Sequence, residues 1–270
     1  MGYQPESARV FAGNNKREKR LAFIVQSVAT RHFVSLREIA EAFGVNMQTA
    51  RRDVAYLDEL HVITKTHGGA VSREEPDALS VSERLNIHED DKQRIARTAA
   101  TFVNDGDIIY LDGASTIAYM APYLLQKQLQ VVTNFMSVAN ELKSGWPNIE
   151  VTVTGGYYFP RSEILLGPPA LETIRHLHID KVFMGAAGLT EDGIYNANML
   201  VVELEQTVIA QATATYLLVD DTKFGRPSLM PICGFDRINT IFTNKPASPS
   251  IEQAITAAGC AIHVCTADQE

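Results

Sequence analysis

Seven short apolar runs, rich in β-branched and aromatic residues and mostly separated by helical patterns, constrain the fold of this chain more than any other feature. They span residues 107–111, 129–133, 149–155, 180–186, 215–219, 239–243 and 260–264. Strands of a parallel sheet are buried on both faces and read as continuous apolar runs, and helices form the crossovers between them. The sequence therefore predicts an α/β domain with a mostly parallel, helix-covered sheet.

Small or polar residues follow five of these runs, at the points where the strands are expected to end. Glycine and threonine often end strands simply to make turns, which is one interpretation of each loop. The other is a ligand site, because open parallel sheets bind ligands beyond the carboxyl ends of their strands. For the set of loops we predict one crevice, lined by Asp112, Gly113, Ala114, Ser115, Thr116, Asn134, Gly155, Gly156 and Lys223.

The loop 112–116 is expected to open a helix and to bind a phosphate group. Its backbone N–H groups and the hydroxyls of Ser115 and Thr116 would donate to the phosphate oxygens, and Lys223 would supply a positive charge. Asp112 and Glu203 are expected to accept hydrogen bonds from hydroxyl groups of the same ligand.

Charge is divided unevenly along the chain, whose formal net charge is −8. Residues 1–71 hold ten Lys and Arg against seven Asp and Glu, a net of +3, whereas the other 199 residues hold fourteen against twenty-five, a net of −11. Such an asymmetry suggests two domains with different partners, the first of them facing a polyanion. We predict a flexible start at 1–15, a first domain at 16–71, a linker at 72–90 with a turn or short strand near 79–85, and a second domain at 91–266.

Three helices are predicted in the first domain. The first covers about 16–29, and the second begins after Ser35, which can cap it, with Glu38 able to complete a capping box. Gly44 suits a tight turn because it tolerates positive φ, and Asn46 is a good N-cap for the third helix. Helix, short turn and helix form the helix-turn-helix arrangement, whose second helix reads the major groove of DNA.

The third helix is predicted to bury Ala50, Val54 and Leu57, which recur at helical spacing. This phase leaves glutamine and arginine on a small outer face, where they can contact adenine and guanine edges. A charged helix face is often merely solvated, so the interpretation depends on the capped preceding helix and the local positive charge. The predicted DNA-binding residues here are Asn46, Met47, Gln48, Thr49, Arg51 and Arg52.

A short hairpin is predicted directly after the third helix. Val62, Ile63 and Thr64 favour a strand, and residues 67–69 favour a turn before a return strand. A hairpin in this position would be a wing. Lys65 and His67 are expected to lie near DNA phosphates.

The stretch "SLREIAEAFGVNMQTARRDVAYLDELHVITKTHGGA", residues 35–70, resembles the N-terminal domain of the DeoR family of bacterial transcriptional regulators. The matching residues include the Arg51-Arg52-Asp53 triplet and the wing tetrapeptide His67-Gly68-Gly69-Ala70. The segments "LDGAST", "VVTN", "TGGYY", "DKVFMGAAGL" and "DDTKF" resemble the effector domain of the same family, which is similar to the sugar-phosphate isomerase and CoA-transferase fold. The resemblance covers about residues 17–265.

The resemblance implies that a phosphorylated sugar or related metabolite binds at the strand-end loops and releases DNA. Two departures from the family pattern bear on which metabolite fits. Members usually read Asp-x-Gly-Thr-Thr where this chain has residues 112–116, so Ala114 stands where the pattern has its glycine. Members often have Glu-Val-Lys where this chain has Glu203-Leu204-Glu205, which exchanges a cation for an anion.

The leading hypothesis is a transcriptional regulator, a repressor of a carbohydrate-metabolism operon, that binds double-stranded operator DNA as a homo-oligomer, a dimer or tetramer. The rival is a sugar-phosphate isomerase or deaminase with an accessory DNA-binding domain, in which Asp112, Glu203 and Asp220 do acid–base work. Fold analogy does not transfer chemistry, and the rival leaves the DNA-binding motif unexplained. We expect no enzymatic activity and no cofactor.

Composition narrows the remaining function classes. No run of about 18 apolar residues occurs, so no membrane span is expected, and the start of the chain lacks an apolar signal core. Cys233, Cys260 and Cys265 lie in apolar surroundings and are interpreted as reduced thiols of a cytoplasmic protein. His176 and His178 are a candidate metal pair, but ordinary surface or core histidines are favoured, so no metal is predicted.

Overall fold

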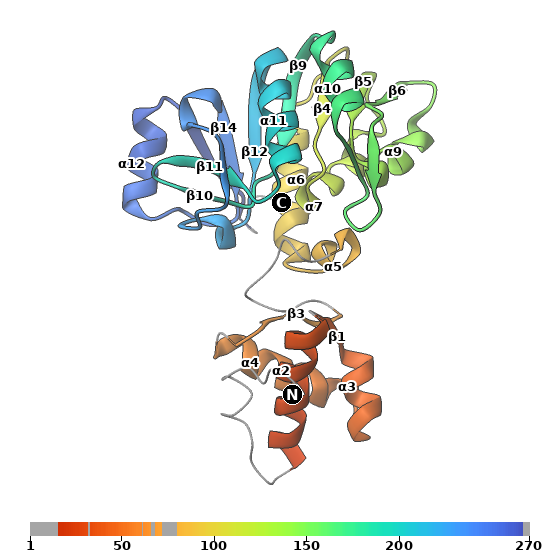
Figure 1. The fold of residues 1–270 in the computed structure, drawn as a ribbon, viewed down its shortest axis with the longest axis vertical. Helices are drawn as coiled ribbons and strands as arrows, with labels where there is room; N and C mark the ends of the chain where they lie inside the picture. Colours follow the sequence, from red (N-terminus) through yellow and green to blue (C-terminus); the bar gives the residue numbers. More distant parts are fainter. Residues whose placement is uncertain (1–15, 32, 61, 66–67, 72–79, 267–270) are drawn as a thin grey trace. The chain divides into compact units, whose positions relative to one another are not determined.

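The computed structural model describes residues 16–31, 33–60, 62–65, 68–71 and 80–266 (Figure 1). The chain divides into two compact units, Met1–Glu89 and Asp90–Glu270. The start predicted at 1–15 and most of the predicted linker, residues 72–79, lie outside the described residues.

The first unit contains the three predicted helices and a small antiparallel sheet with strand order β1-β3-β2. All three helices contribute to one buried core. It includes Leu21, Ile24 and Val28 of the first helix, Ile39 of the second, and Ala50, Val54 and Leu57 of the third. The first strand, before the second helix, was not predicted because three residues carry too little pattern. The elements are α2 (Lys16–Arg31), β1 (Phe33–Ser35), α3 (Leu36–Phe43), α4 (Met47–Glu59), β2 (Thr64–Lys65) and β3 (Gly69–Val71).

The turn between α3 and α4 has the predicted chemistry. Ser35 Oγ accepts from the backbone N–H of Glu38 at 3.0 Å, which caps α3. Gly44 ends α3 with a φ of 63°, in the left-handed region that glycine reaches without strain. The short turn brings α4 across α3, as a helix-turn-helix requires.

Residues 81–85 are helical, where the sequence predicted a turn or short strand near 79–85. Ser80 Oγ accepts from the backbone N–H of Glu83, and Glu83 Oε2 accepts in return from the backbone N–H of Ser80 at 2.8 Å. This reciprocal capping box starts α5 (Val81–Leu85). The prediction was wrong because local capping outweighed the polar, acidic composition.

Within the described residues, the second unit is built on a seven-stranded sheet with the order β15-β14-β12-β9-β4-β5-β6. Every neighbouring pair is parallel, so the predicted mostly parallel sheet is confirmed. Each of the seven predicted runs supplies one strand. They are β4 (Ile108–Leu111), β5 (Leu129–Thr133), β6 (Ile149–Val153), β9 (Ile179–Met184), β12 (Ala212–Leu218), β14 (Thr240–Thr243) and β15 (Ala261–Val264).

The strand order reverses once, between β4 and β9. The chain builds β4, β5 and β6 outward in one direction, then returns to the other side of β4 and builds β9, β12, β14 and β15. Leu111 of β4 pairs with Thr133 on one side and with Phe183 on the other. The carboxyl ends of β4 and β9 thus form the topological switch point, where open sheets of this kind bind ligands.

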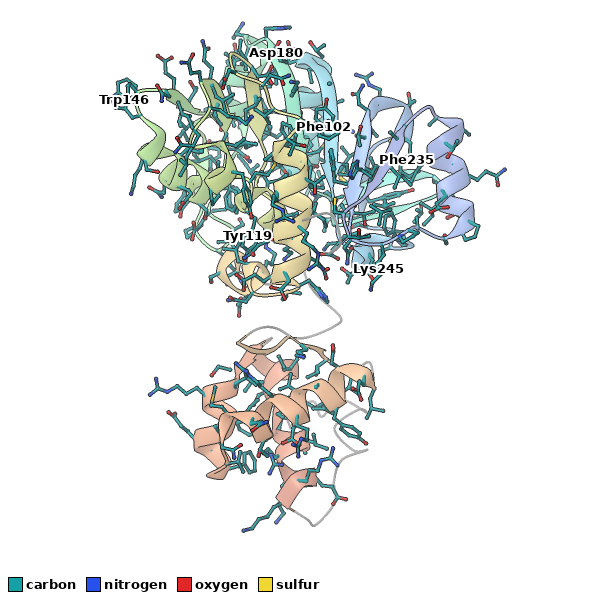
Figure 2. The ribbon with its side chains drawn as sticks, turned by 180° about the vertical axis from the view of Figure 1, so that it is seen from behind. Phe102, Tyr119, Trp146, Asp180, Phe235 and Lys245 are labelled. Carbon is teal, nitrogen blue, oxygen red and sulfur yellow. The ribbon has the colours of Figure 1, made fainter. Side chains whose placement is uncertain are left out.

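Helices cover both faces of the sheet (Figures 1 and 2). Phe102, just after α6, packs edge-on against Phe242 and Tyr216 of the sheet on one face. On the other face α10 and α11 pack side by side. The first crossover consists of two short helices, and Pro122 lies in the first turn of the second. The helices are α6 (Glu89–Ala100), α7 (Ser115–Ala118), α8 (Ala121–Leu124), α9 (Met136–Leu142), α10 (Pro168–Arg175), α11 (Met199–Gln211) and α12 (Pro249–Ala257).

Two short antiparallel excursions extend beyond the carboxyl edge of the sheet, and neither was predicted. The hairpin β7–β8 follows β6, and a three-stranded sheet of order β10-β11-β13 packs against α11. The strands are β7 (Tyr157–Phe159), β8 (Ile164–Leu166), β10 (Gly188–Thr190), β11 (Gly193–Asn196) and β13 (Met230–Cys233).

Candidate functional site

The predicted reading face of α4 lies on the outside of the first unit. Ala50, Val54 and Leu57 are buried, so the opposite side of the helix carries the exposed residues. Asn46 Oδ1 accepts from the backbone N–H of Thr49 at 2.8 Å and caps α4. Of the predicted reading residues, Asn46, Met47, Gln48, Arg51 and Arg52 have exposed side chains, and Thr49 is half-buried.

The wing hairpin is joined to α4 by a side-chain contact. Asp58 Oδ1 accepts from the backbone N–H of Lys65 at 3.0 Å, and the Lys65 side chain is exposed. The first strand of this hairpin, β2, is shorter than predicted, because it begins at Thr64. Ile63, which was expected to belong to the strand, lies before it and is buried in the core. His67, the other predicted wing residue, lies outside the described residues.

Asp53 has a structural part that reasoning from the sequence did not find. Its carboxylate is buried at 2% exposure and is bound by the guanidinium of Arg20, which is also buried. Arg17 Nε lies 3.4 Å from the second carboxylate oxygen, and the Arg17 guanidinium lies 4.5 Å from the ring centre of Tyr56. The amino-terminal turn of α2 is therefore fastened to α4 by charge and by stacking.

In the second unit, Asp112 lies at the switch point. Its backbone N–H donates to the carbonyl oxygen of Phe183 at 3.0 Å, and its Oδ2 accepts from the backbone N–H of Gly185 at 3.4 Å. The side chain is 5% exposed. Asp112 thus spans the ends of β4 and β9, where the topology predicts a ligand.

Ala114 lies directly against the loop after β9. A Cβ atom added to Gly185 would stand 2.4 Å from the Cβ of Ala114, so the methyl group of Ala114 already fills the space above Gly185. Ser115 and Thr116 follow in the short helix α7 and are both buried. The predicted loop 112–116 is thus closed on one side by the β9 loop.

Asn134 lies beside Gly113 at the end of β5. Its Nδ2 donates to the carbonyl oxygen of Leu165 at 3.4 Å, while Oδ1 has no hydrogen-bond partner among the described residues, although the side chain is only 1% exposed. Gly155 and Gly156 follow β6 with φ values of 74° and 114°. The ends of β4, β5 and β6 follow one another along the sheet.

Glu203 and Glu205 lie on different sides of α11. The Glu203 side chain is exposed, whereas that of Glu205 is 3% exposed and accepts from Asn196 Nδ2 at 3.3 and 3.5 Å. Burial, and then the charge of Asp112, raise the pKa of Glu205 well above its usual value of 4.5. Glu205, rather than the predicted Glu203, is the carboxyl group that faces the Asp112 side of the sheet.

Two further groups nearby, Tyr110 and Cys233, have raised pKa values. Burial, with smaller contributions from Asp112 and Glu205, raises the pKa of the Tyr110 phenol well above 10. Burial and the charge of Glu205 raise the pKa of the Cys233 thiol to about 12. Burial is therefore the main cause of both pKa shifts, and the nearby carboxyl groups add to it.

Lys223 lies at the end of β12, in the short 3-10 helix η3 (Asp221–Lys223). Asp220 caps this helix by accepting from the backbone N–H of Thr222 at 3.0 Å. In the sheet, β9 separates β12 from β4. Lys223 therefore shares the carboxyl edge with the 112–116 loop but follows a strand two places away.

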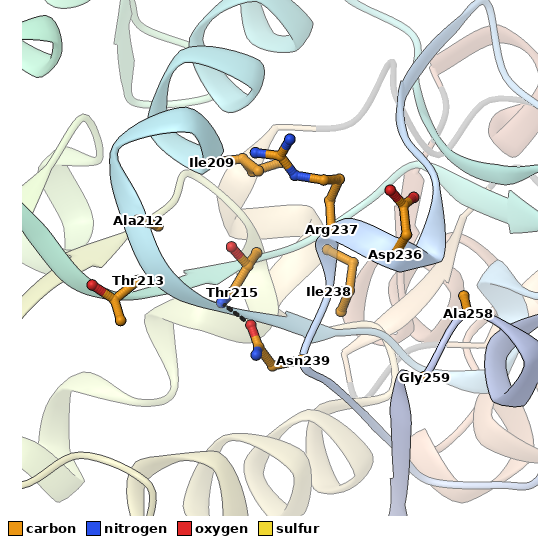
Figure 3. Close-up of a pocket in the computed structure, with 10 residues that line it drawn as sticks. All are labelled: Ile209, Ala212, Thr213, Thr215, Asp236, Arg237, Ile238, Asn239, Ala258 and Gly259. Atoms are coloured by element: carbon orange, nitrogen blue, oxygen red, sulfur yellow. Dashed lines mark hydrogen bonds between the residues drawn. The ribbon is translucent and has the colours of Figure 1, made fainter.

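A separate hollow of about 310 Å³ lies at the opposite, amino-terminal edge of the strands (Figure 3). The backbone N–H of Thr215 donates to Asn239 Oδ1 at 2.8 Å on its wall. None of the predicted ligand residues lines it. Its walls are formed by Ile209, Ala212, Thr213, Thr215, Asp236, Arg237, Ile238, Asn239, Ala258 and Gly259.

Neither a membrane span nor a metal cluster was found in the part of the chain that the structure describes. There, every helix is too short or too polar to cross a bilayer, and no group of three or more potential ligands could hold a metal ion. His176 contacts Glu172 and His178 contacts Asp180, both at the surface.

Two family models match this chain. Residues 20–75 match the DeoR-like helix-turn-helix domain, and residues 87–245 match the DeoR C terminal sensor domain. The chain is 32% identical over 234 residues to the uncharacterized HTH-type transcriptional regulator YulB of Bacillus subtilis, with 86% of this chain and 90% of the relative covered. It is 29% identical over 247 residues to the HTH-type transcriptional regulator IolR of the same organism, with 91% and 98% covered.

Among solved structures, ribose 5-phosphate isomerase A from Methanocaldococcus jannaschii is similar to half of this chain. The match covers 50% of this chain and 54% of the isomerase at 19% identity, with a TM-score of 0.37. The family models and the relatives, by contrast, span both units. The chain therefore belongs to the DeoR family of DNA-binding transcriptional regulators, with an N-terminal helix-turn-helix domain and a C-terminal sensor domain.

Proposed function

We propose that this regulator represses a carbohydrate-metabolism operon and that a phosphorylated sugar or related metabolite releases it from operator DNA. The observation that carries the proposal is the meeting of Asp112, Gly185 and Asn134 at the carboxyl edge of the sheet. Ligands of open parallel sheets bind at this position. Such a ligand would control the binding of DNA by the helix-turn-helix domain.

The chemistry of the crevice supports a ligand with both phosphate and hydroxyl groups. The loop 112–116 resembles the phosphate loop of sugar-phosphate sensors, and Ser115 and Thr116 offer hydroxyl donors. Asn134 Oδ1 is a buried acceptor beside Gly113 that lacks a partner among the described residues. A hydroxyl group of the ligand would donate to it.

The phosphate belongs at the 112–116 loop, away from Glu205. Asp112 and Glu205 lie close enough for the charge of Asp112 to raise the pKa of Glu205, and the Asp112 carboxylate would repel a phosphate placed between the two side chains. The hydroxylated end of the effector therefore points toward Asp112, and its phosphate toward Ser115, Thr116 and the cation Lys223. In this proposal Asp112 and Glu205 accept hydrogen bonds from ligand hydroxyl groups, the role that was expected of Asp112 and Glu203.

Recognition of operator DNA implies a homo-oligomer, either a dimer or a tetramer. Operators read by helix-turn-helix proteins are commonly palindromic, and their half-sites match a two-fold axis in the protein. The sensor unit would carry the contacts between copies, and the effector would act by its different affinity for the two arrangements. Binding to chromosomal DNA implies a cytoplasmic location.

The first experiment is a gel-shift titration of the full-length protein with the DNA upstream of its own gene. A shifted band at low salt that persists against excess random DNA is expected. The absence of any shift from protein that is folded by circular dichroism would contradict DNA binding at this promoter. Purified protein should also show no turnover of ribose 5-phosphate or glucosamine 6-phosphate. Turnover of either substrate would favour the rival hypothesis of an isomerase or deaminase.

The second experiment titrates sugar phosphates against the protein–DNA complex. Ser115→Ala and Lys223→Ala should keep the DNA affinity of the parent and lose release by the effector. Ser144→Ala and Lys143→Ala, exposed positions elsewhere on the same unit, are the matched controls and should respond like the parent. Release of both test variants at the parent's concentration would place the phosphate elsewhere.

A further inference from the structure

The amino-terminal turn of α2 is a basic surface that has no role in the proposed function. Residues 16–20, "KREKR", hold four cations and one acid. Lys16 and Lys19 are exposed, the Arg17 side chain is 52% exposed, and Arg20 is buried. The cations of this turn thus differ in what they are free to contact.

The turn is fastened beside the reading helix. Arg20 and Arg17 both hold the carboxylate of Asp53 on α4, and Arg17 also lies over the ring of Tyr56, one helical turn further along α4. The contacts use the two arginines and leave the two lysines pointing to solvent. A charged turn held in this way keeps its lysines in one position relative to α4, which limits the conformational entropy lost on binding.

The helical phase of α4 shows which flank the turn occupies. Arg51 shares a side with Asp58, seven residues on, and Asp58 binds the backbone N–H of Lys65 in the wing. Arg52 shares the other side with Tyr56, four residues on, where Arg17 lies. The wing and the α2 turn therefore flank the reading face of α4 on opposite sides.

We propose that Lys16 and Lys19 bind phosphates of the DNA backbone on the flank opposite the wing. A helix in the major groove has a phosphate backbone along each side, because the groove is only about 12 Å wide. With the wing and Lys65 on one side, the α2 turn lies where the second backbone passes. Contacts to phosphates carry no sequence information, so Lys16 and Lys19 add affinity and fix the register of α4, while base reading stays with α4.

The test uses the full-length protein, a duplex that the parent selects from a random pool, and a random duplex of the same length. Lys16→Gln/Lys19→Gln removes both charges. The matched control, Lys143→Gln/Arg175→Gln, removes two exposed charges from the sensor unit. Binding is measured over a range of salt concentrations, and circular dichroism melting checks that each variant folds.

For the test variant, the slope of log K against log salt should become shallower by about 1.8, since each phosphate contact contributes about 0.9. Its affinity should fall by the same factor for the selected and the random duplex, and the control should behave like the parent. Lys16→Glu/Lys19→Glu should weaken binding further. A parental slope in the glutamine variant, a loss confined to the selected duplex, or an equal effect in the control would each overturn the proposal.

Discussion

The carboxylate of Asp53 on α4 is bound by the guanidinium of Arg20 on α2, and both side chains are buried. This ion pair lies between the first and last helices of the three-helix core. Buried pairs of this kind contribute little net free energy compared with apolar packing, but breaking one leaves an uncompensated charge. The pair therefore fixes how α4 is rotated against α2.

Removing one partner of this pair should destabilise the first unit strongly. Asp53→Asn leaves Arg20 buried without its counter-charge, and we expect a loss of about 3–5 kcal/mol. Hydrogen exchange of the α2 and α4 amides measures it. Arg20→Met/Asp53→Leu should recover most of the stability, whereas Glu41→Gln, at an exposed pair with Arg37, should change little. Equal amide protection in Asp53→Asn and the parent would show that the Arg20–Asp53 pair does not stabilise the first unit.

Arg51 should distinguish operator from random DNA. The side chain is exposed on α4, and a bidentate contact to guanine is worth about 1–3 kcal/mol of discrimination. Arg51→Ala should therefore lose more affinity for a selected duplex than for a random one, as measured by fluorescence anisotropy. Arg52 lies on the Tyr56 side, and its substitution should affect both duplexes alike. Equal losses for Arg51→Ala would show that it only contacts phosphate.

Glu205 should make the sensor unit less stable as pH rises. Its folded pKa is raised above the usual 4.5, so the folded state binds a proton that the unfolded chain releases. The stabilising effect is complete below about pH 4.5 and is lost as pH rises toward the folded pKa. Glu205→Gln should be close to the parent near pH 5 and more stable than it at pH 8, in urea unfolding.

The matched control for that measurement is Glu203→Gln, two residues away on the exposed side of the same helix. It should follow the parent at both pH values. A difference between Glu205→Gln and the parent that stays constant with pH would argue against a raised pKa.

Gly185 and Ala114 should behave as one packing unit. An alanine at 185 would bring two methyl carbons to 2.4 Å, so Gly185→Ala should cost about 1–3 kcal/mol. Ala114→Gly in the same chain removes the clash and should restore most of that loss in denaturant unfolding. If the effects of the two substitutions simply add, the contact across the switch point is not as described.

The strands of the central sheet could be predicted because each is a continuous apolar run with a length typical of a buried strand. The order of the strands could not, since an apolar run does not say which run lies beside it. The excursions β7–β8 and β10-β11-β13 were missed for a different reason. Their strands have only three or four residues, and several of their side chains are partly exposed, so no period is visible.

The candidate site residues show the same division. Asp112 and Asn134 could be placed at the carboxyl edge of the sheet because they directly follow strongly patterned strands. The sequence prediction names Glu203, whereas the helical phase points to Glu205, because Val202, Glu205, Val208 and Ile209 share the buried side of α11. A carboxyl group on an apolar face was the signal. Asp53 gave a similar signal, at i+3 from Ala50, but its partners Arg17 and Arg20 are distant in sequence.

On α4, the residues that hold the helix in place and those that face outward occupy separate sides of one short segment. Ala50, Asp53, Val54 and Leu57 are buried, while Met47, Gln48 and Arg51 are not. Binding preference can therefore be exchanged without rebuilding the domain. A library that varies only positions 47, 48 and 51 should yield folded regulators with new target sequences, and these could drive independent genetic circuits in one cell.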